Sequence, residues 1–114
     1  MDKTQMIRLV ERQHRAYNRR NLDEFCLCFH PEVVVVNLMD NRTTRGLTAF
    51  RAGYRTLFES NSSLHCEVVR RTILTDTIID EEWVTGASKY PDGLHAAAIY
   101  GFKNGLIDRV WFVR

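Results

Sequence analysis

Four strand-like segments follow one another in the second half of the chain, and this feature restricts the possible folds most. Asn104-Gly105 is a strong signal for a tight two-residue hairpin, because both turn positions require positive φ. Pro91-Asp92-Gly93 is another typical turn. Segments joined by turns this short pair with their neighbours, so we expect a mostly antiparallel sheet. The predicted segments are residues 64–74, 76–90, 95–103 and 106–114.

The first half of the chain has helical patterns. Residues 3–19 place apolar or amphipathic side chains at steps of three, four and three, which is one face of a helix. These residues are Ile7, Val10, His14 and Tyr17. A second helix is predicted from about Asn21, and Pro31 is expected to end it because proline disfavours a helical residue before it.

A valine run and a third helix complete the pattern. Val33–Val36 predicts the first strand, residues 40–46 read as a polar loop, and residues 47–59 predict the third helix. Its inward side chains are expected to be Phe50, Tyr54, Leu57 and Phe58. Helices first and antiparallel strands afterwards indicate an α+β fold, in which three N-terminal helices pack on one face of a curved sheet.

Composition narrows the classes of protein. A chain of 114 residues with 45% hydrophobic and 26% charged residues fits a single domain, residues 1–114. The net charge of +2 and the lack of a long basic run argue against nucleic acid binding. No apolar stretch approaches the ~20 residues of a membrane span, and the N-terminus lacks the apolar segment of a signal peptide. We therefore expect a soluble, cytoplasmic protein with no membrane partner.

The last two strands are apolar on both sides. An antiparallel sheet with one face in water should alternate apolar and polar residues, and these strands do not. A second copy of the chain is the natural cover, so we expect a homodimer joined through the outer sheet face. The residues expected at that interface are Ile99, Ile107, Trp111 and Val113.

Three motifs, AYNRRNLDEF, RGLTAFRAGY and AAAIYGFKNGLIDRVWF, together resemble the nuclear-transport-factor-2-like (NTF2-like) superfamily, in its SnoaL-like, steroid-isomerase-like bacterial branch. The resemblance implies a cone-shaped α+β fold, a homodimer, and an apolar pocket between the helices and the inner sheet face. The superfamily includes ketosteroid isomerases, polyketide cyclases, dehydratases and non-catalytic binders. Its fold therefore does not select one activity.

The resemblance also bears on ketosteroid isomerisation. The aspartate base of those isomerases aligns with Asn37, and their two oxyanion donors align with Gln13 and Ala98. An amide cannot abstract a proton from carbon, so we expect no ketosteroid isomerisation by that mechanism. Asn37 shares one side of its strand with Val33 and Val35. It either orients a ligand in the pocket or caps the end of the strand.

Two groups of titratable residues are candidates for catalysis. His14 is interpreted first as a core histidine that hydrogen-bonds a neighbour, and alternatively as a base near the pocket floor. Asp80 and Glu82 are interpreted first as cross-strand ion pairs that fix register, and alternatively as a base inside the cavity. Tyr17 could present its hydroxyl to the same cavity. The predicted strand partners are Arg70 with Glu82, Arg71 with Glu81, and Thr72 with Asp80.

The favoured function is binding of a small hydrophobic ligand that carries one carbonyl, hydroxyl or carboxylate group. One alternative is a cofactor-independent isomerase, cyclase or hydratase, and another is a dimeric association module. Cys26, Cys28 and Cys66 form neither a CxxC motif nor an even set, and no metal or organic cofactor is expected. The predicted pocket wall comprises Tyr17, Val35, Asn37, Phe50, Tyr54, Ala96, Ala98, Val110 and Phe112.

Overall fold

Helices and strands follow the predicted α+β order in the computed structural model, which describes all of residues 1–114. The elements are α1 (Lys3–Asn18), α2 (Leu22–Cys26), β1 (Phe29–Asn37), β2 (Arg42–Arg45), α3 (Leu47–Ser60), β3 (His65–Ile73), β4 (Thr77–Thr85), β5 (Leu94–Lys103) and β6 (Leu106–Val113). None of the helices has the length and apolar character needed to span a membrane.

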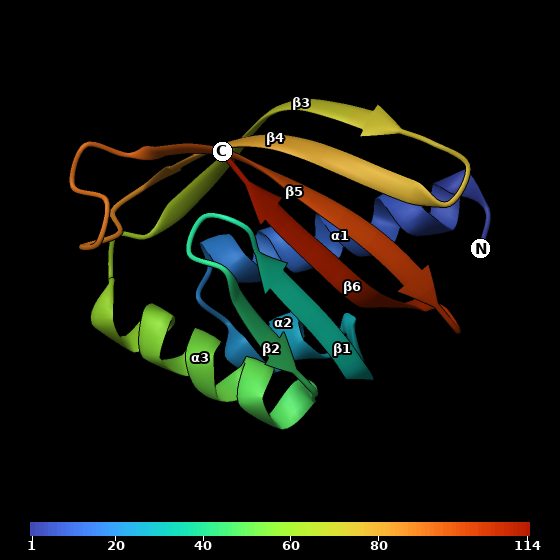
Figure 1. The fold of residues 1–114 in the computed structure, drawn as a ribbon, viewed down its shortest axis with the longest axis horizontal. Coiled ribbons are helices and arrows are strands. Elements are labelled where there is room, and N and C mark those ends of the chain that lie inside the picture. Colours follow the sequence, from blue (N-terminus) through green and yellow to red (C-terminus); the bar gives the residue numbers. More distant parts are fainter.

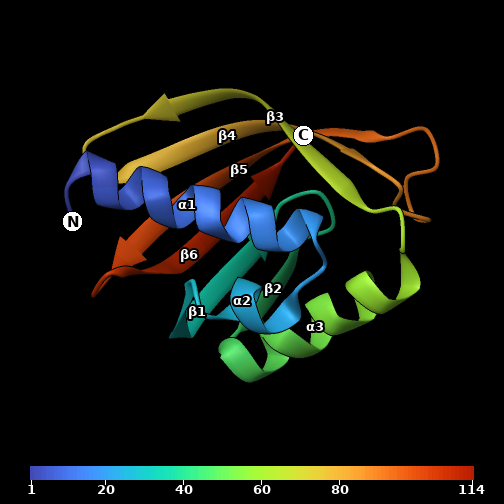
Figure 2. The same ribbon diagram turned by 180° about the vertical axis from the view of Figure 1, so that it is seen from behind.

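A single curved sheet of six strands, in the order β2-β1-β6-β5-β4-β3, forms the frame of the molecule. Only β1 and β6 pair in parallel, so the prediction of a mostly antiparallel sheet is confirmed. Helix α1 crosses one face of this sheet, as the two opposite views in Figures 1 and 2 show, and α3 packs against β1 and β2. The helices and this inner face enclose the core.

Phe25 of α2 lies at the centre of the aromatic part of the core. Its ring centroid lies 4.9 Å from that of Phe29, 5.7 Å from Phe50, 4.7 Å from Tyr54 and 5.6 Å from Phe58. Aromatic pairs at these separations add to the stabilisation that comes from burying their apolar area. This cluster ties α2, β1 and α3 into one end of the cone.

Helix α1 begins at a capping box. The Asp2 carboxylate accepts a hydrogen bond from Gln5 N at 2.8 Å, and the Gln5 side chain accepts one from Asp2 N at 2.9 Å. The most deeply buried stripe of the helix differs from the predicted one, because Ile7 and His14 are only partly buried. Its members are Met6, Val10, Gln13 and Ala16.

The second helix is shorter than predicted. It ends at Cys26, and the residues from Phe29 to Pro31 already belong to β1. Phe29 reaches the aromatic core from the strand, where its ring lies 4.4 Å from that of Phe50. Proline is tolerated there because the ladder between β1 and β6 is interrupted between Phe29 and Val34, so no hydrogen bond from residue 31 is required.

The predicted polar loop contains a strand. Residues 42–45 form β2, which pairs with β1 from Val34 opposite Arg45 to Asn37 opposite Arg42. The connecting turn is closed by the Asp40 carboxylate, which accepts from Arg42 N at 3.1 Å. An edge strand made of polar residues has no apolar alternation, so its sequence resembles a loop.

The predicted register of β3 and β4 is wrong by one residue. Leu74 N donates to Thr77 O at 2.8 Å, so the turn has two residues rather than three. A bulge near Val69 shifts the register once more beyond it. The observed partners are Arg70 with Glu81, Arg71 with Asp80, Thr72 with Ile79, and Val68 with Glu82.

Ile107 is the residue of the predicted dimer face that the structure places elsewhere. Gly101 pairs with Arg109 and Phe102 pairs with Ile107, so Asp108 is one extra residue in β6. This bulge reverses the side on which the preceding residue points. Ile107 therefore lies fully buried in the core rather than on the outer face.

Candidate functional site

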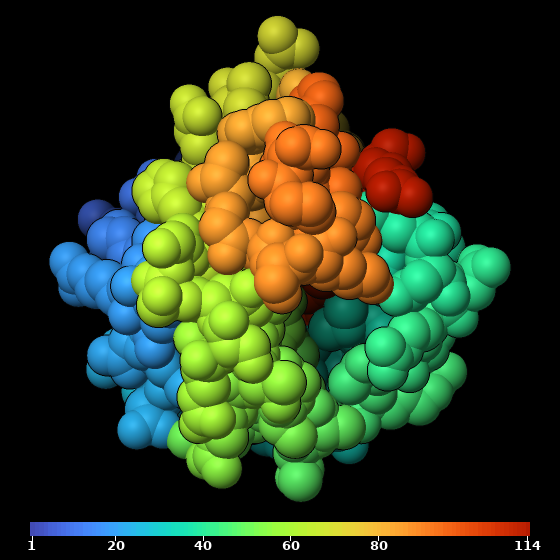
Figure 3. Space-filling model, turned by 90° about the vertical axis from the view of Figure 1, so that its left-hand side faces the viewer, coloured from blue at the N-terminus to red at the C-terminus, as the bar shows by residue number.

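A cavity of about 320 Å³ lies between the helices and the inner sheet face. Figure 3 shows the hollow through which it opens, between the β4–β5 loop in orange, the green α3 and the teal turn after β1. Hydrophobic residues make up 19 of its 25 lining residues. A concave, mainly apolar site with few polar groups is the usual form of a small-molecule site.

The predicted wall residues gather at this cavity with one exception. Eight of the nine predicted residues line the cavity, and their role in binding a ligand stays a prediction. The eight that line it are Tyr17, Val35, Asn37, Phe50, Tyr54, Ala96, Val110 and Phe112.

Ala98 does not line the cavity, and its predicted place in the wall is wrong. It is fully buried in the core cluster together with Val10 and Ile78. Its small side chain therefore packs in the core rather than beside an opening.

Several wall residues were missed from the sequence. They are Cys66 from β3, Gln13 from α1, and Lys89 and Tyr90 from the β4–β5 loop, whereas Glu82 from β4 lies on the wall as its alternative interpretation expected. Loop residues carry no periodic signal that would predict them. For Glu82 a signal existed, since every second residue from Ile78 points to the same side. The sequence did not decide which side of β4 faces inward, because both sides carry an isoleucine, Ile78 and Ile79.

Glu82 is the only acidic residue on the cavity wall, and 8% of its surface is exposed. Burial and, second to it, the nearby negative charge of Asp80 raise the pKa of its carboxyl to about 7, against the opposing effects of the Cys66 thiol and Arg71. No cation and no N–H donor contacts the carboxylate, and the Cys66 thiol is the side chain that hydrogen-bonds it. The favoured interpretation of Glu82 as a cross-strand ion pair with Arg70 is therefore wrong, since its partner on β3 is Val68.

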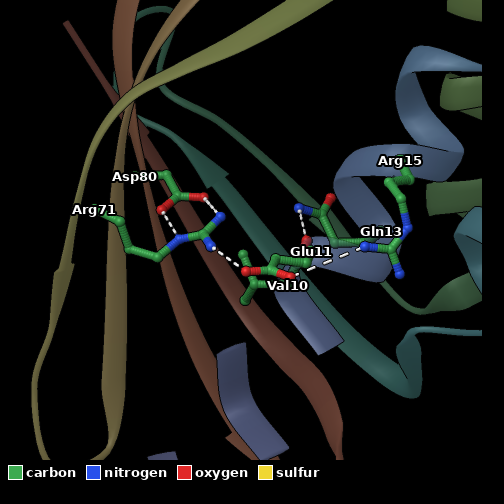
Figure 4. A network of polar contacts seen from close by, with 6 residues as sticks. All are labelled: Val10, Glu11, Gln13, Arg15, Arg71 and Asp80. Carbon is green, nitrogen blue, oxygen red and sulfur yellow. Dashed lines mark hydrogen bonds and ion pairs between the residues drawn. The ribbon is translucent and has the colours of Figure 1, made fainter. Parts of the chain in front are cut away.

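Asp80 lies on the same side of β4 but has a cationic partner. It is completely buried, and Arg71 binds it with two nitrogens, Nε to Oδ1 at 2.7 Å and Nη2 to Oδ2 at 2.9 Å (Figure 4). Arg71 Nη1 also reaches Glu11 on α1 at 3.3 Å. A two-point guanidinium–carboxylate pair has strong directional hydrogen bonds. Asp80 is thus a buried cross-strand partner of Arg71 and does not line the cavity.

Tyrosine hydroxyls supply the other polar groups of the wall. Gln13 Nε2 donates to Val10 O at 2.9 Å and to the Tyr100 hydroxyl at 3.1 Å. The hydroxyls of Tyr17 and Tyr54 take part in none of the protein's hydrogen bonds, and since no buried polar atom lacks a partner, both are open to the cavity that their residues border. Burial raises the pKa of all three phenols, so they remain protonated at neutral pH.

Asn37 both caps its strand and faces the cavity. Its Oδ1 accepts from Met39 N at 2.9 Å, which closes the turn after β1. Its side chain also belongs to the cavity wall. The two alternatives that the sequence left open are therefore compatible.

His14 lies away from the cavity, so it is not a base at the pocket floor. Its Nε2 lies 2.7 Å from Cys66 O, and because a carbonyl only accepts, this nitrogen must donate. Asn18 bridges to the same residue, accepting from Cys66 N at 2.8 Å. His14 thus fastens α1 to β3, in line with the favoured interpretation. No group of three or more His, Cys, Asp or Glu side chains is arranged to hold a metal ion.

Solved structures share this fold at low sequence identity. A cystatin-fold protein from Novosphingobium aromaticivorans has a TM-score of 0.85 and 19% identity, with 100% of this chain and 99% of that chain covered. A protein assigned as a polyketide cyclase from Sinorhizobium meliloti has a TM-score of 0.81 and 17% identity, with 92% and 93% covered. A protein with a ketosteroid-isomerase-like fold from Catenulispora acidiphila, solved in complex with trimethylamine, has a TM-score of 0.77 and 13% identity, with 93% and 84% covered.

No curated protein matches the chain in sequence. The structural likeness establishes the fold and leaves the activity open, since proteins with different assigned activities share it. The family is established by sequence. Residues 10–110 match the model of the SnoaL-like domain, and the chain therefore belongs to the SnoaL-like family of the NTF2-like superfamily.

Proposed function

We propose that this protein binds a small hydrophobic molecule in the cavity between the helices and the sheet. The observation that carries the proposal is the apolar wall around about 320 Å³ of space that opens to solvent. A well-packed core leaves few voids larger than a water molecule, so a cavity of this size is unusual unless it is occupied in function. The unpartnered hydroxyls of Tyr17 and Tyr54 provide polar contacts that orient the occupant.

Filling the cavity tests this proposal. Ala96 is on the cavity wall, whereas its neighbour Ala97 points to the other side of β5 and pairs with Val113. Ala96→Leu should weaken binding of the neutral dye N-phenyl-1-naphthylamine about tenfold or more, because overfilling a packed site costs about 1–3 kcal/mol. Ala97→Leu is the matched control and should bind the dye as wild type does. Equal fluorescence titrations for wild type and Ala96→Leu would place the binding site elsewhere.

A second candidate function is cofactor-free acid–base catalysis by Glu82. It is favoured by the pKa of about 7 of this carboxyl, which makes both its acid and base forms available near neutral pH. The reaction would then be an isomerisation or an elimination on the bound molecule. The resemblance aligns the ketosteroid isomerase base with Asn37, so turnover of a Δ5-3-ketosteroid by that route is not expected.

A general base probe tests the second candidate. In 5-nitrobenzisoxazole, removal of the C3 proton by a base breaks the N–O bond and releases a coloured phenolate. Wild type should open this ring roughly 100-fold faster than Glu82→Gln, with a rate that rises with pH through about 7. Glu81→Gln is the control, because Glu81 bonds His95 and lies partly exposed on the other side of β4. Equal rates for wild type and Glu82→Gln would exclude Glu82 as a catalytic base.

A further inference from the structure

Glu82 has no cationic partner among the side chains around the cavity. Arg71, the cation that acts on the Glu82 carboxyl, is bound by Asp80 and Glu11. Lys89 stands at the mouth, largely exposed, with its Nζ 3.8 Å from an Asp40 carboxylate oxygen. Each of these two cations has its own acidic partner, and neither contacts Glu82.

We infer that the occupant of the cavity is an amine, a hydrophobic molecule whose ammonium group pairs with the Glu82 carboxylate. This inference rests on the proposed binding function and names the chemical class of the ligand. It replaces the expectation of a ligand with a carbonyl, hydroxyl or carboxylate group, which assumed a cavity wall without an acid.

The groups that face Glu82 support a cation rather than an anion. Charged neighbours are limited to the Asp80–Arg71 pair, which is neutral as a unit, so an ionised Glu82 leaves one net negative charge beside the cavity. A ligand anion would be repelled, and a neutral ligand would leave a desolvated carboxylate unpaired, which costs free energy. The uncharged neighbours from other elements are Cys66 on β3, Tyr17 on α1, Tyr54 on α3 and Tyr100 on β5.

Aromatic rings make the rest of the cavity favourable to a cation. Ring faces carry negative potential and attract ammonium groups, most strongly where water is excluded. The phenolic oxygens can also accept hydrogen bonds from an ammonium group. The aromatic residues of the wall are Tyr17, Phe25, Phe29, Phe50, Tyr54, Tyr90, Tyr100 and Phe112.

Three probes of one size but different charge test the inference by calorimetry at pH 8. They are 1-naphthylmethylamine, 1-naphthylmethanol and 1-naphthoate. We expect the amine to bind at least about tenfold tighter than the alcohol, as one buried charge-assisted hydrogen bond provides, and the carboxylate to bind most weakly. Lowering the pH from 8 to 6 should weaken amine binding and not alcohol binding, because protonation of Glu82 removes the counter-charge.

Two variants identify the residue responsible. Glu82→Gln should abolish the preference for the amine while it still binds the alcohol, and Glu81→Gln should retain the preference. If wild type binds the alcohol or the carboxylate as tightly as the amine, or if Glu82→Gln keeps the preference, the inference is wrong although a hydrophobic binding site remains. If the three probes and the neutral dye all fail to bind, the proposed function itself fails.

Discussion

Asp80 and Glu82 point to the same side of β4, yet Arg71 neutralises only the first. Arg71 stands directly opposite Asp80 and binds it at 2.7 and 2.9 Å, whereas the residue opposite Glu82 is Val68. The bulge between these two pairs separates a satisfied carboxylate in the core from an unsatisfied one on the cavity wall. Of these two alternate residues of one strand, only Glu82 thus lacks a cationic partner.

The first prediction concerns stability and pH. The pKa of Glu82 is about 7 in the folded protein against 4.5 for an ordinary glutamate, so between these values the folded state binds a proton that the unfolded state has lost. Folding stability should therefore fall as pH rises from about 4.5 to 7 and then level off, by about 3 kcal/mol in all from this group. Urea unfolding at pH 5 and pH 8 measures the change.

Glu82→Gln provides the comparison for that measurement. A neutral amide does not titrate, so the variant should lose this pH dependence and exceed wild type in stability at pH 8. Glu81→Gln should leave the pH dependence in place, since its partners lie on the outer side of the strand. A wild-type protein whose stability is flat between pH 5 and pH 8 would show that Glu82 is ionised at little cost.

The second prediction concerns the neighbour that raises the pKa of Glu82. Asp80→Asn removes a negative charge and leaves the Arg71 guanidinium without its carboxylate partner. Both changes favour the ionised form, so the pKa of Glu82 should fall below about 7. Carbon-detected NMR titration of the glutamate carboxyls measures it, with exposed Glu67→Gln as the control. An unchanged pKa would mean that burial alone sets it.

The third prediction concerns the bulge in β6. Ile107→Ala should destabilise the protein by about 2–5 kcal/mol, because it opens a hole in a fully packed core. Ile99→Ala is the control, since Ile99 is only partly buried on the outer face of β5, opposite Trp111. Urea denaturation of both variants measures the difference. A loss for Ile107→Ala no larger than for Ile99→Ala would place Ile107 on the outer face after all.

The fourth prediction concerns the homodimer, which we propose forms through the outer sheet face. Trp111, Ile99 and Val113 are partly exposed on that face, where a second copy would bury them. Trp111→Glu should shift the protein towards monomer in analytical ultracentrifugation at micromolar concentration, because it places a charge in a desolvated interface. Ser62→Glu, in an exposed loop, adds the same charge and should remain dimeric. A wild-type monomer, or a dimeric Trp111→Glu, would contradict the proposal.

The parts of the molecule that depend on local pattern were predictable. Helix periodicity gave α1 and α3 to within one residue of their ends, and turn residues such as Asn104-Gly105 gave the last hairpin. These signals work because backbone geometry fixes which residues share a face. The polar strand β2 and the early end of α2 were not predictable, since tertiary pairing decided both.

By itself, the sequence determined the α+β order, the family and most of the apolar cavity wall, because each follows from residue type and spacing within one element. Only the tertiary structure decided which side of the sheet the titratable residues occupy. A one-residue shift in register, or one bulge, turns every side chain beyond it to the other face of the sheet. The sequence of a short strand does not encode its register or the position of its bulges. For this reason Ile107 lies in the core, and Glu82 is the only acidic residue on the cavity wall.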